Sequence, residues 1–193
     1  MALGDLASAL KSYQADLAVA ALLAKSDPGN AYSQHDLSAA YEYIGNVQMA
    51  QGDLAGALKS YRDSLAIIER LAQSNPGDAG SQRELSVAYE KIGNVQVAQG
   101  ELTGGLKSYG DSLAIRVRLT QSDPSDAGWQ RDLSVSYANL ADVYLRSNDP
   151  DNALPALRQG QAIMDRLVKH SPNDAELQDD LGWFNDQIAA LTK

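Results

Sequence analysis

The sequence repeats itself every 48 residues, and this period constrains the fold more than any other feature. Residues 52–99 and 100–147 are identical at 27 of 48 aligned positions. One leucine and one proline recur in all four copies, namely Leu10, Leu58, Leu106 and Leu154, and Pro28, Pro76, Pro124 and Pro172. A fixed period of this length is typical of repeat proteins, whose units bury their apolar faces against one another. We therefore divide the chain into units 4–51, 52–99, 100–147 and 148–193.

Two kinds of helix-breaking segment divide each unit. One is a Ser-Asp/Asn-Pro cluster, such as SDPGN at 26–30, in which Pro ends one helix and the following Asn or Asp caps the next. The other is a glycine followed by an acid, such as Gly52-Asp53, in which the glycine closes a helix in the left-handed conformation. Between these segments, apolar residues at steps of three and four predict helices. The predicted helices are 5–26, 31–50, 53–74, 79–98, 101–122, 127–146, 152–170 and 174–191, the last acting as a cap.

Short links and internal glycines predict how these helices pack. Links of two to six residues place neighbouring helices antiparallel, so we expect stacked helix hairpins in an all-α solenoid. Glycine costs a helix about 1 kcal/mol relative to alanine, so Gly45 needs a packing reason. We predict that it lets two helices approach, with the small Ala57 on the facing helix. Pro155 is expected to delay or kink the seventh helix.

The segment from Tyr41 to Leu65 has a recognisable pattern. It carries Tyr, Ile-Gly, then Gly-Asp-Leu, Ala-Leu, Tyr and Ser-Leu at helical spacing, and a proline closes the unit. This pattern resembles the tetratricopeptide repeat, and the resemblance covers nearly the whole chain. The usual repeat of that family has about 34 residues, so this is a lengthened variant, similar in that respect to kinesin light chains. The resemblance implies a right-handed superhelix whose concave groove is lined by the first helix of each hairpin.

Charge and composition exclude several functions. The net charge is −9, which disfavours phosphate backbones and anionic membrane surfaces as partners. The chain has no cysteine, and His35 and His170 do not share a metal-binding spacing. No nucleophile elbow, phosphate loop or calcium loop is present. We therefore expect no metal, no cofactor and no enzymatic activity, and a cytoplasmic protein without a membrane span or signal peptide.

A polar stripe along the first helix of each hairpin is the candidate ligand groove. Its members are His35, Glu42, Asn46, Arg83, Glu90, Asn94, Arg131, Asp142 and Arg146. The resemblance implies that Asn46 and Asn94 hold the backbone of an extended peptide. Members of the family that clamp a C-terminal carboxylate carry lysine where this chain has Glu42 and Glu90. A mixed or basic peptide therefore fits better, as does a helix with lysine or arginine near the glutamates and an acid near Arg83 and Arg131. The alternative is that Asn46 and Asn94 only form hydrogen bonds between adjacent helices.

These features predict a single repeat domain, residues 1–193, that binds a peptide or partner protein in its groove without catalysis. One alternative is a scaffold that assembles with itself, because Ala21-Leu22 makes the exposed edge of the first helix unusually apolar. Another is an excised or engineered segment of a larger signalling or adaptor protein.

Overall fold

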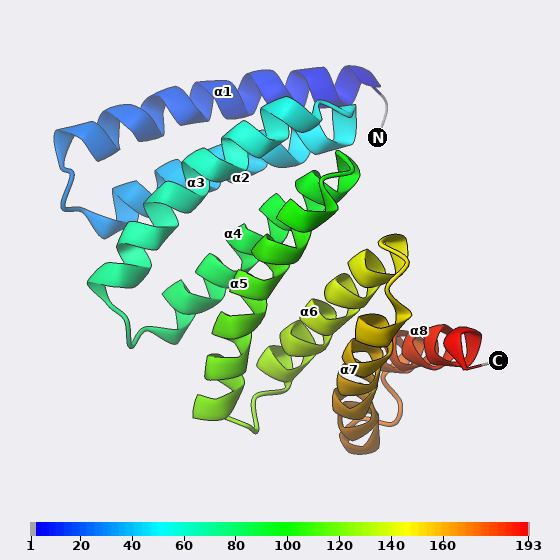
Figure 1. Ribbon diagram of the computed structural model, residues 1–193. Coiled ribbons are helices and arrows are strands. Elements are labelled where there is room, and N and C mark those ends of the chain that lie inside the picture. Colours follow the sequence, from blue (N-terminus) through cyan, green and yellow to red (C-terminus); the bar gives the residue numbers. More distant parts are fainter. Residues whose placement is uncertain (1–2, 193) are drawn as a thin grey trace. The chain divides into compact units, whose positions relative to one another are not determined.

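The computed structural model describes residues 3–192, and within them the chain forms eight α-helices and no strand (Figure 1). The helices are α1 (Leu3–Ser26), α2 (Ala31–Gln51), α3 (Leu54–Ser74), α4 (Ala79–Ala98), α5 (Leu102–Ser122), α6 (Ala127–Arg146), α7 (Pro150–His170) and α8 (Ala175–Leu191). Every predicted helix is present, and each boundary agrees to within two residues. The all-α repeat class is therefore confirmed.

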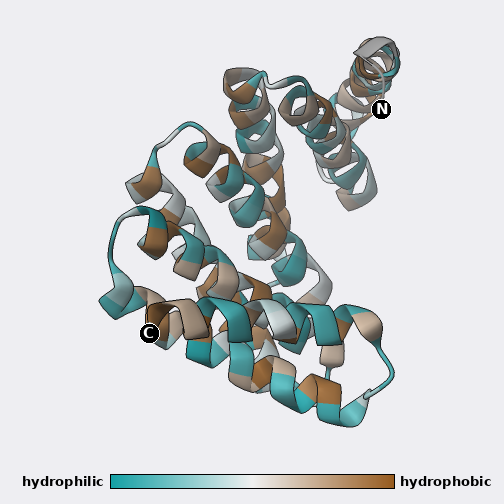
Figure 2. Ribbon diagram, turned by 90° about the vertical axis from the view of Figure 1, so that its right-hand side faces the viewer, coloured by the Kyte–Doolittle hydropathy of each residue, from teal (hydrophilic) through white to brown (hydrophobic). Residues whose placement is uncertain are grey.

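The helices group into two compact units, Met1–Glu101 and Leu102–Lys193. In the first unit α1 packs on α2, α2 on α3, and α3 on α4. In the second unit α5 packs on α6, α6 on α7, and α7 on α8. Each helix carries both hydrophobic and hydrophilic residues along its length (Figure 2), as expected when a helix is packed on one side and solvated on the other. The single-domain organisation and the hand of a superhelix stay predictions.

Each unit has its own hydrophobic core. In the first, one cluster joins α3 to α4 and contains Ala57, Tyr61, Ile92 and Val95. In the second, a larger cluster draws on α6, α7 and α8 and includes the fully buried Ala141, Leu157 and Met164 together with Phe184. Burying a large apolar side chain stabilises a fold by about 1.5–3 kcal/mol, so these clusters hold the helices in register.

Acidic and amide caps begin the helices where the sequence predicts them. Asn30, Asp78, Asp126 and Asp174 each accept a hydrogen bond from a backbone N–H in the first turn of the following helix. Asp53 caps α3 in the same way, through Gly56. Gly52 and Gly100 have φ values of 78° and 81°, which confirms the predicted left-handed turns.

One glutamine per repeat joins α2, α4, α6 or α8 to the last turn of the preceding helix or to the loop after it, a role that the sequence did not reveal. Gln34 and Gln82 donate from Nε2 to the carbonyls of Ala24 and Ala72, both at 3.3 Å. The equivalent glutamines in the other two repeats, Gln130 and Gln178, donate to the carbonyls of Pro124 and Pro172. These bonds satisfy carbonyls that lie beyond the regular hydrogen bonding of the preceding helix.

The close approach predicted at Gly45 exists, but its partner is a different residue. A Cβ added to Gly45 would lie 2.6 Å from Cε1 of Tyr61, so the glycine makes room for the tyrosine ring rather than for Ala57. Tyr61 is only 5% exposed. The gap left by the missing side chain is therefore filled by an aromatic ring from α3.

The predicted delay at Pro155 is wrong, because α7 begins five residues earlier, at Pro150. Pro150 lies at the first helical position, where its fixed φ is favourable, and Asp149 caps the helix by accepting from the N–H of Asn152 at 3.2 Å. Pro155 then lies inside the helix and removes only the hydrogen bond to the carbonyl of Asp151. Asp151 is exposed, so water can bind that carbonyl.

Candidate functional site

The structure brings three of the predicted groove residues, His35, Glu42 and Arg83, together at one pocket in the first unit. The pocket has a volume of about 400 Å³ and opens between α2 and α4. Its remaining lining residues are Ser38, Ala39, Tyr43, Ser64, Ile68, Gly80, Glu84, Val87 and Ala88. Ser64 and Ile68 come from α3, so this helix contributes to the pocket that α2 and α4 enclose. We call α2, α4, α6 and α8, which follow the Ser-Asp/Asn-Pro or equivalent turn of each repeat, the first-type helices. We call this site the α2–α4 pocket.

Ion pairs connect the two long walls of this pocket. Nε2 of His35 lies 3.1 Å from Oε1 of Glu84, and Nζ of Lys91 lies 3.3 Å from Oε1 of Glu42. The side chains of His35 and Glu84 are about half exposed, at 50% and 46%. An exposed pair such as His35–Glu84 stabilises a fold by only about 0–1 kcal/mol, so a ligand can share the Glu84 carboxylate at low cost. The Lys91–Glu42 pair is less exposed, at 24% and 37%.

Asn46 lies one helical turn after Glu42, is not part of the lining of the α2–α4 pocket, and joins three helices. Its Oδ1 accepts hydrogen bonds from the hydroxyl of Tyr61 at 2.8 Å and from Nζ of Lys91 at 3.0 Å. The same ammonium group lies 5.6 Å from the centroid of the Tyr61 ring. For Asn46 the structure thus contains the hydrogen bonds between adjacent helices that the alternative interpretation predicted.

Burial, and secondarily the negative charge of Glu42, raise the pKa of Tyr61 to about 12. The hydroxyl therefore keeps its proton throughout the neutral range and remains a donor to Asn46. This arrangement fixes the orientation of the Asn46 amide. Among residues 3–192, none accepts a hydrogen bond from its Nδ2.

Glu90 and Asn94 lie on α4 but outside the lining of the α2–α4 pocket. Glu90 is half-buried and Asn94 is exposed. Both side chains take part in interactions within the chain. Their predicted role in ligand binding stays a prediction.

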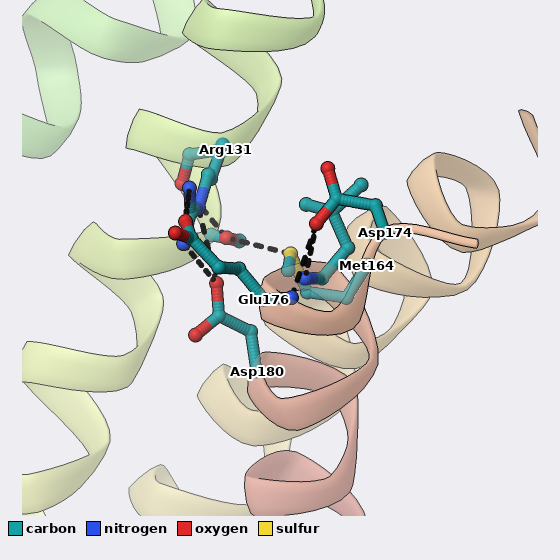
Figure 3. A network of polar contacts seen from close by, with 7 residues as sticks. Arg131, Met164, Asp174, Glu176 and Asp180 are labelled. Atoms are coloured by element: carbon teal, nitrogen blue, oxygen red, sulfur yellow. Dashed lines mark hydrogen bonds and ion pairs between the residues drawn. The ribbon is translucent and has the colours of Figure 1, made fainter. Parts of the chain in front are cut away.

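In the second unit, Arg131 of α6 is fixed by two carboxylates of α8 (Figure 3). Its Nη2 lies 3.0 Å from Oδ2 of Asp180, and its Nη1 lies 2.9 Å from Oε2 of Glu176. The hydrogen bond to Glu176, followed by the hydrogen bond and charge of Asp180, raises the pKa of Arg131 further above its ordinary value. This guanidinium joins the last two first-type helices of the chain.

Asp142 and Arg146, the remaining predicted residues, pair with each other. Nε of Arg146 lies 2.8 Å from Oδ2 of Asp142, one turn away on the same helix. Both side chains are about half exposed, at 45% and 53%. They form a local surface pair within α6.

The sequence reading missed a regular pairing between consecutive first-type helices. His35 pairs with Glu84, Glu42 with Lys91 and Arg131 with Asp180, and each pair is separated by 49 residues. The offset is one residue more than the repeat. A search for opposite charges at this offset would have found all three pairs. Several residues of the polar stripe that we predicted to bind a ligand therefore also form ion pairs between neighbouring repeats.

The described residues contain neither a cluster of metal ligands nor a membrane-spanning helix. Between residues 3 and 192, no group of three or more histidine, aspartate or glutamate side chains is arranged to hold a metal ion. Over the same part of the chain, every helix is too short or too polar to cross a bilayer.

Comparison with protein families confirms the predicted resemblance. A family model described as tetratricopeptide repeat matches residues 31–76, which span α2, α3 and the turn after them. This segment contains the Tyr41 to Leu65 pattern that carries the resemblance. No curated protein sequence matches the chain.

Solved structures with the same fold are distant in sequence. BtubC (BKLC) from P. vanneervenii has a TM-score of 0.61 and 14% identity, over 97% of this chain and 73% of that chain. The yeast histone chaperone Hif1 has a TM-score of 0.60 and 12% identity, over 98% of both chains. A putative kinesin light chain with nearly identical TPR-like repeats, from Podosopora anserina, has a TM-score of 0.57 and 17% identity, over 97% of this chain and 87% of that chain. At these identities the likeness shows the helical repeat fold alone.

Proposed function

We propose that this chain of tetratricopeptide-like repeats is a non-catalytic module that binds an extended segment of a partner protein in the α2–α4 pocket. The observation that carries the proposal is the convergence of His35, Glu42 and Arg83 on one cavity of about 400 Å³. A cavity of this size accepts one or two side chains of a peptide. One relative in fold, Hif1, is described as a scaffold protein recruiting protein complexes to core histones, which supports a binding role for the fold.

The lining of the pocket favours a ligand of mixed charge with a small apolar side chain. Val87, Ala39 and Ile68 provide apolar surface for that side chain. The carboxylates of Glu42 and Glu84 attract a lysine or arginine of the ligand. Glu84 is held by an exposed pair with His35, and Glu42 by a partly exposed pair with Lys91. Arg83 attracts an acidic group, to which a guanidinium can donate two parallel hydrogen bonds.

Asn46 is proposed to contribute its amide N–H₂ group to the ligand backbone. Its oxygen already accepts from Tyr61 and Lys91, so the group acts toward a ligand as a donor only. A backbone carbonyl of an extended peptide is the matching acceptor. The sequence predicted that the amide would offer a ligand both a donor and an acceptor, but in the structure only the donor is available.

Peptide selection followed by affinity measurement tests the proposal. Random peptides displayed on phage are selected against the chain, and dissociation constants of the winners are measured by fluorescence anisotropy. We expect Arg83→Met and Glu42→Gln each to weaken binding about tenfold, the loss typical of one charge-assisted hydrogen bond. The matched control is Lys59→Met with Asp63→Asn, which removes an exposed pair with a 3.0 Å separation on α3, outside the pocket.

The control should bind as the wild type does, and circular dichroism should show that all variants remain folded. If selected peptides bind the two pocket variants and the control with equal affinity, the α2–α4 pocket is not the binding site. If no peptide is selected, the proposal that this cavity recognises extended segments is contradicted.

A further inference from the structure

One face of α1 is apolar and exposed. Two of its positions, Val19 and Leu23, are buried or partly buried in the equivalent helices α3, α5 and α7, whereas the position of Leu22 carries an exposed arginine in each of them. Val19, Leu22 and Leu23 are 59%, 70% and 50% exposed. The residue equivalent to Val19 one repeat later is Ile67 of α3, which is 5% exposed. Three repeats later the equivalent residue is Ile163 of α7, also 5% exposed.

In α3 and α7 the equivalent face meets a first-type helix that precedes it. In the first unit α2 packs on α3, with the Tyr61 ring lying over Gly45. In the second unit α6 packs on α7, and Ile163 shares a hydrophobic cluster with Leu133 and Ala141 of α6. Both units therefore show what kind of element covers this face.

A pocket beside this face repeats part of the α2–α4 pocket. It has a volume of about 510 Å³ and is lined from α1 and α2 alone. Its lining residues are Tyr13, Asp16, Val19, Ala20, Leu23, His35, Asp36, Ala39, Ala40 and Tyr43. One repeat later, the positions of Asp16, Ala20, His35 and Asp36 are those of Ser64, Ile68, Arg83 and Glu84, which line the α2–α4 pocket. In the α2–α4 pocket one wall comes from α2, the helix before α3. The pocket beside α1 has no equivalent wall among its lining residues.

The regular pairing between first-type helices does not include Asp36 of α2, which lies beside the exposed face of α1. Asp36 occupies the position of Glu84 and Asp180, which pair with His35 and Arg131 across 49 residues. Within the described part of the chain, Asp36 has no ion-pair or hydrogen-bond partner for its carboxylate. A helix that covered α1 in the same register would bring a cationic side chain to Asp36.

We propose that the exposed face of α1 and Asp36 dock an amphipathic helix of a partner protein. That helix has the pattern of α2, α4 and α6: an arginine, lysine or histidine positioned for Asp36, and a glycine or alanine ten residues later, as at Gly45 and Ala141. Its apolar side chains cover Val19, Leu22 and Leu23. The docking site lies outside the α2–α4 pocket and does not depend on the function proposed for it.

A second copy of the chain is a poor occupant of this face. Its last first-type helix, α8, carries Asp179 at the position of His35, Arg83 and Arg131. Docking α8 on α1 would therefore place Asp179 against Asp36, and like charges at close range oppose association. The charge pattern thus favours a different polypeptide over the self-assembly that the apolar edge alone predicts.

A labelled peptide with the sequence of residues 78–98 provides a probe. It carries Arg83 at the cationic position, Gly93 at the small position, and the helix-capping Asp78. We expect it to bind the full chain with 1:1 stoichiometry in fluorescence anisotropy titrations. Val19→Ser with Leu23→Ser should weaken binding at least about tenfold, since the apolar contact supplies most of the affinity. Val135→Ser on α6, which is 36% exposed, is the matched control and should bind as the wild type does.

A charge exchange tests the register of the docked helix. Asp36→Lys should weaken binding of the wild-type peptide at least about fivefold, and a peptide with Arg83→Glu should recover affinity for that variant.

Equal affinity of the peptide for Val19→Ser/Leu23→Ser and for the Val135→Ser control would overturn the proposal, as would the absence of binding to the wild type. Sedimentation velocity should show a monomer. Self-association that Val19→Ser/Leu23→Ser abolishes would make a second copy the occupant and would also overturn it.

Discussion

Tyr61 is positioned by two different features of α2. Its ring lies over Gly45, where a side chain would collide with it, and its hydroxyl donates to Asn46 at 2.8 Å. In the second unit the equivalent positions hold Ala141 and Leu157, both fully buried. A small residue with a large partner thus recurs, but the glycine is needed only where the partner is an aromatic ring.

The pairing of these positions makes a prediction about compensating substitutions. Gly45→Ala should lower the free energy of unfolding by about 1–3 kcal/mol, because the new methyl group overlaps the Tyr61 ring. Gly45→Ala with Tyr61→Leu reproduces the pair at Ala141 and Leu157, and should lose less than the sum of the two single substitutions. Urea denaturation of the three variants measures this coupling.

Gly110→Ala is the control for the glycine substitution, since nothing lies within 4 Å of an added Cβ there. It should raise the free energy of unfolding by up to about 1 kcal/mol through helix propensity. Equal destabilisation by the two glycine substitutions, or strict additivity in the double variant, would show that Gly45 does not make room for Tyr61.

The raised pKa of Tyr61 makes stability depend on pH in the alkaline range. An unfolded chain releases this proton near pH 10, whereas the folded chain holds it to about pH 12. Between these values the folded state binds more protons, so the free energy of unfolding falls as pH rises. A shift of about two pH units corresponds to about 2–3 kcal/mol. Denaturation at pH 9.5 and pH 12 should show this loss in the wild type and a smaller loss in Tyr61→Phe.

Tyr32→Phe serves as the control for the alkaline titration, because Tyr32 is 86% exposed. Its pH profile should follow that of the wild type. A Tyr61→Phe profile that also follows the wild type would contradict the assignment of the alkaline loss to Tyr61.

The sequence alone predicted part of the contact between Tyr61 and Gly45. Helical spacing predicted that Tyr61 is buried and that Gly45 allows a close approach. It could not predict that the two residues meet, because the contact depends on the rotation of α2 and α3 about their axes. For the same reason, the alternative interpretation predicted a hydrogen bond from Asn46 to an adjacent helix but could not identify Tyr61 as its partner.

At the scale of helices, α8 is held to α6 by charge as well as to α7 by apolar packing. Leu177 and Phe184 of α8 belong to the hydrophobic cluster of the second unit. Arg131 contacts Glu176 and Asp180 from the neighbouring first-type helix. The cap role predicted for this last helix depends on both contacts.

Removing the charge contact should loosen α8 selectively. Arg131→Gln should lower the opening free energy of α8 by about 1 kcal/mol, because the pairs are partly exposed. Hydrogen exchange of α8 amides should then become about fivefold faster relative to α7, and the difference should shrink at high salt. Arg146→Gln is the control, since its partner Asp142 lies on the same helix. If both variants leave α8 equally protected, these ion pairs do not hold the helix.

Helix boundaries were the most predictable feature of the elements. Caps such as Asp78 and turns such as Gly52 act through local backbone geometry, which sequence shows directly. The error at Pro155 arose from treating one proline in isolation. Pro150 and Asp149 start α7 earlier, and a proline in the second turn then costs one solvent-exposed hydrogen bond rather than the start of the helix.

At the scale of the whole molecule, the 48-residue period accounts for the number and order of helices. The two binding surfaces that we propose lie where the sequence departs from that period. The α2–α4 pocket is lined by the carboxylates of Glu42 and Glu84 and by Arg83. These residue types are not all kept in later repeats: Ala138 stands two repeats after Glu42. Within residues 3–192, the carboxylate of Asp36 has no ion-pair or hydrogen-bond partner, whereas Glu84 and Asp180 each have one. Cavities could not be predicted from the period, because their volumes depend on side-chain packing between three helices.

Chemical-shift mapping of a selected peptide on the isotope-labelled chain tests the central claim most directly. If the α2–α4 pocket is the binding site, the amides that shift should cluster at residues 35–43 and 80–88, with smaller changes near Ile68. Shifts confined to α7 and α8, or to the exposed face of α1, with none at these two segments, would contradict the assignment of the binding site.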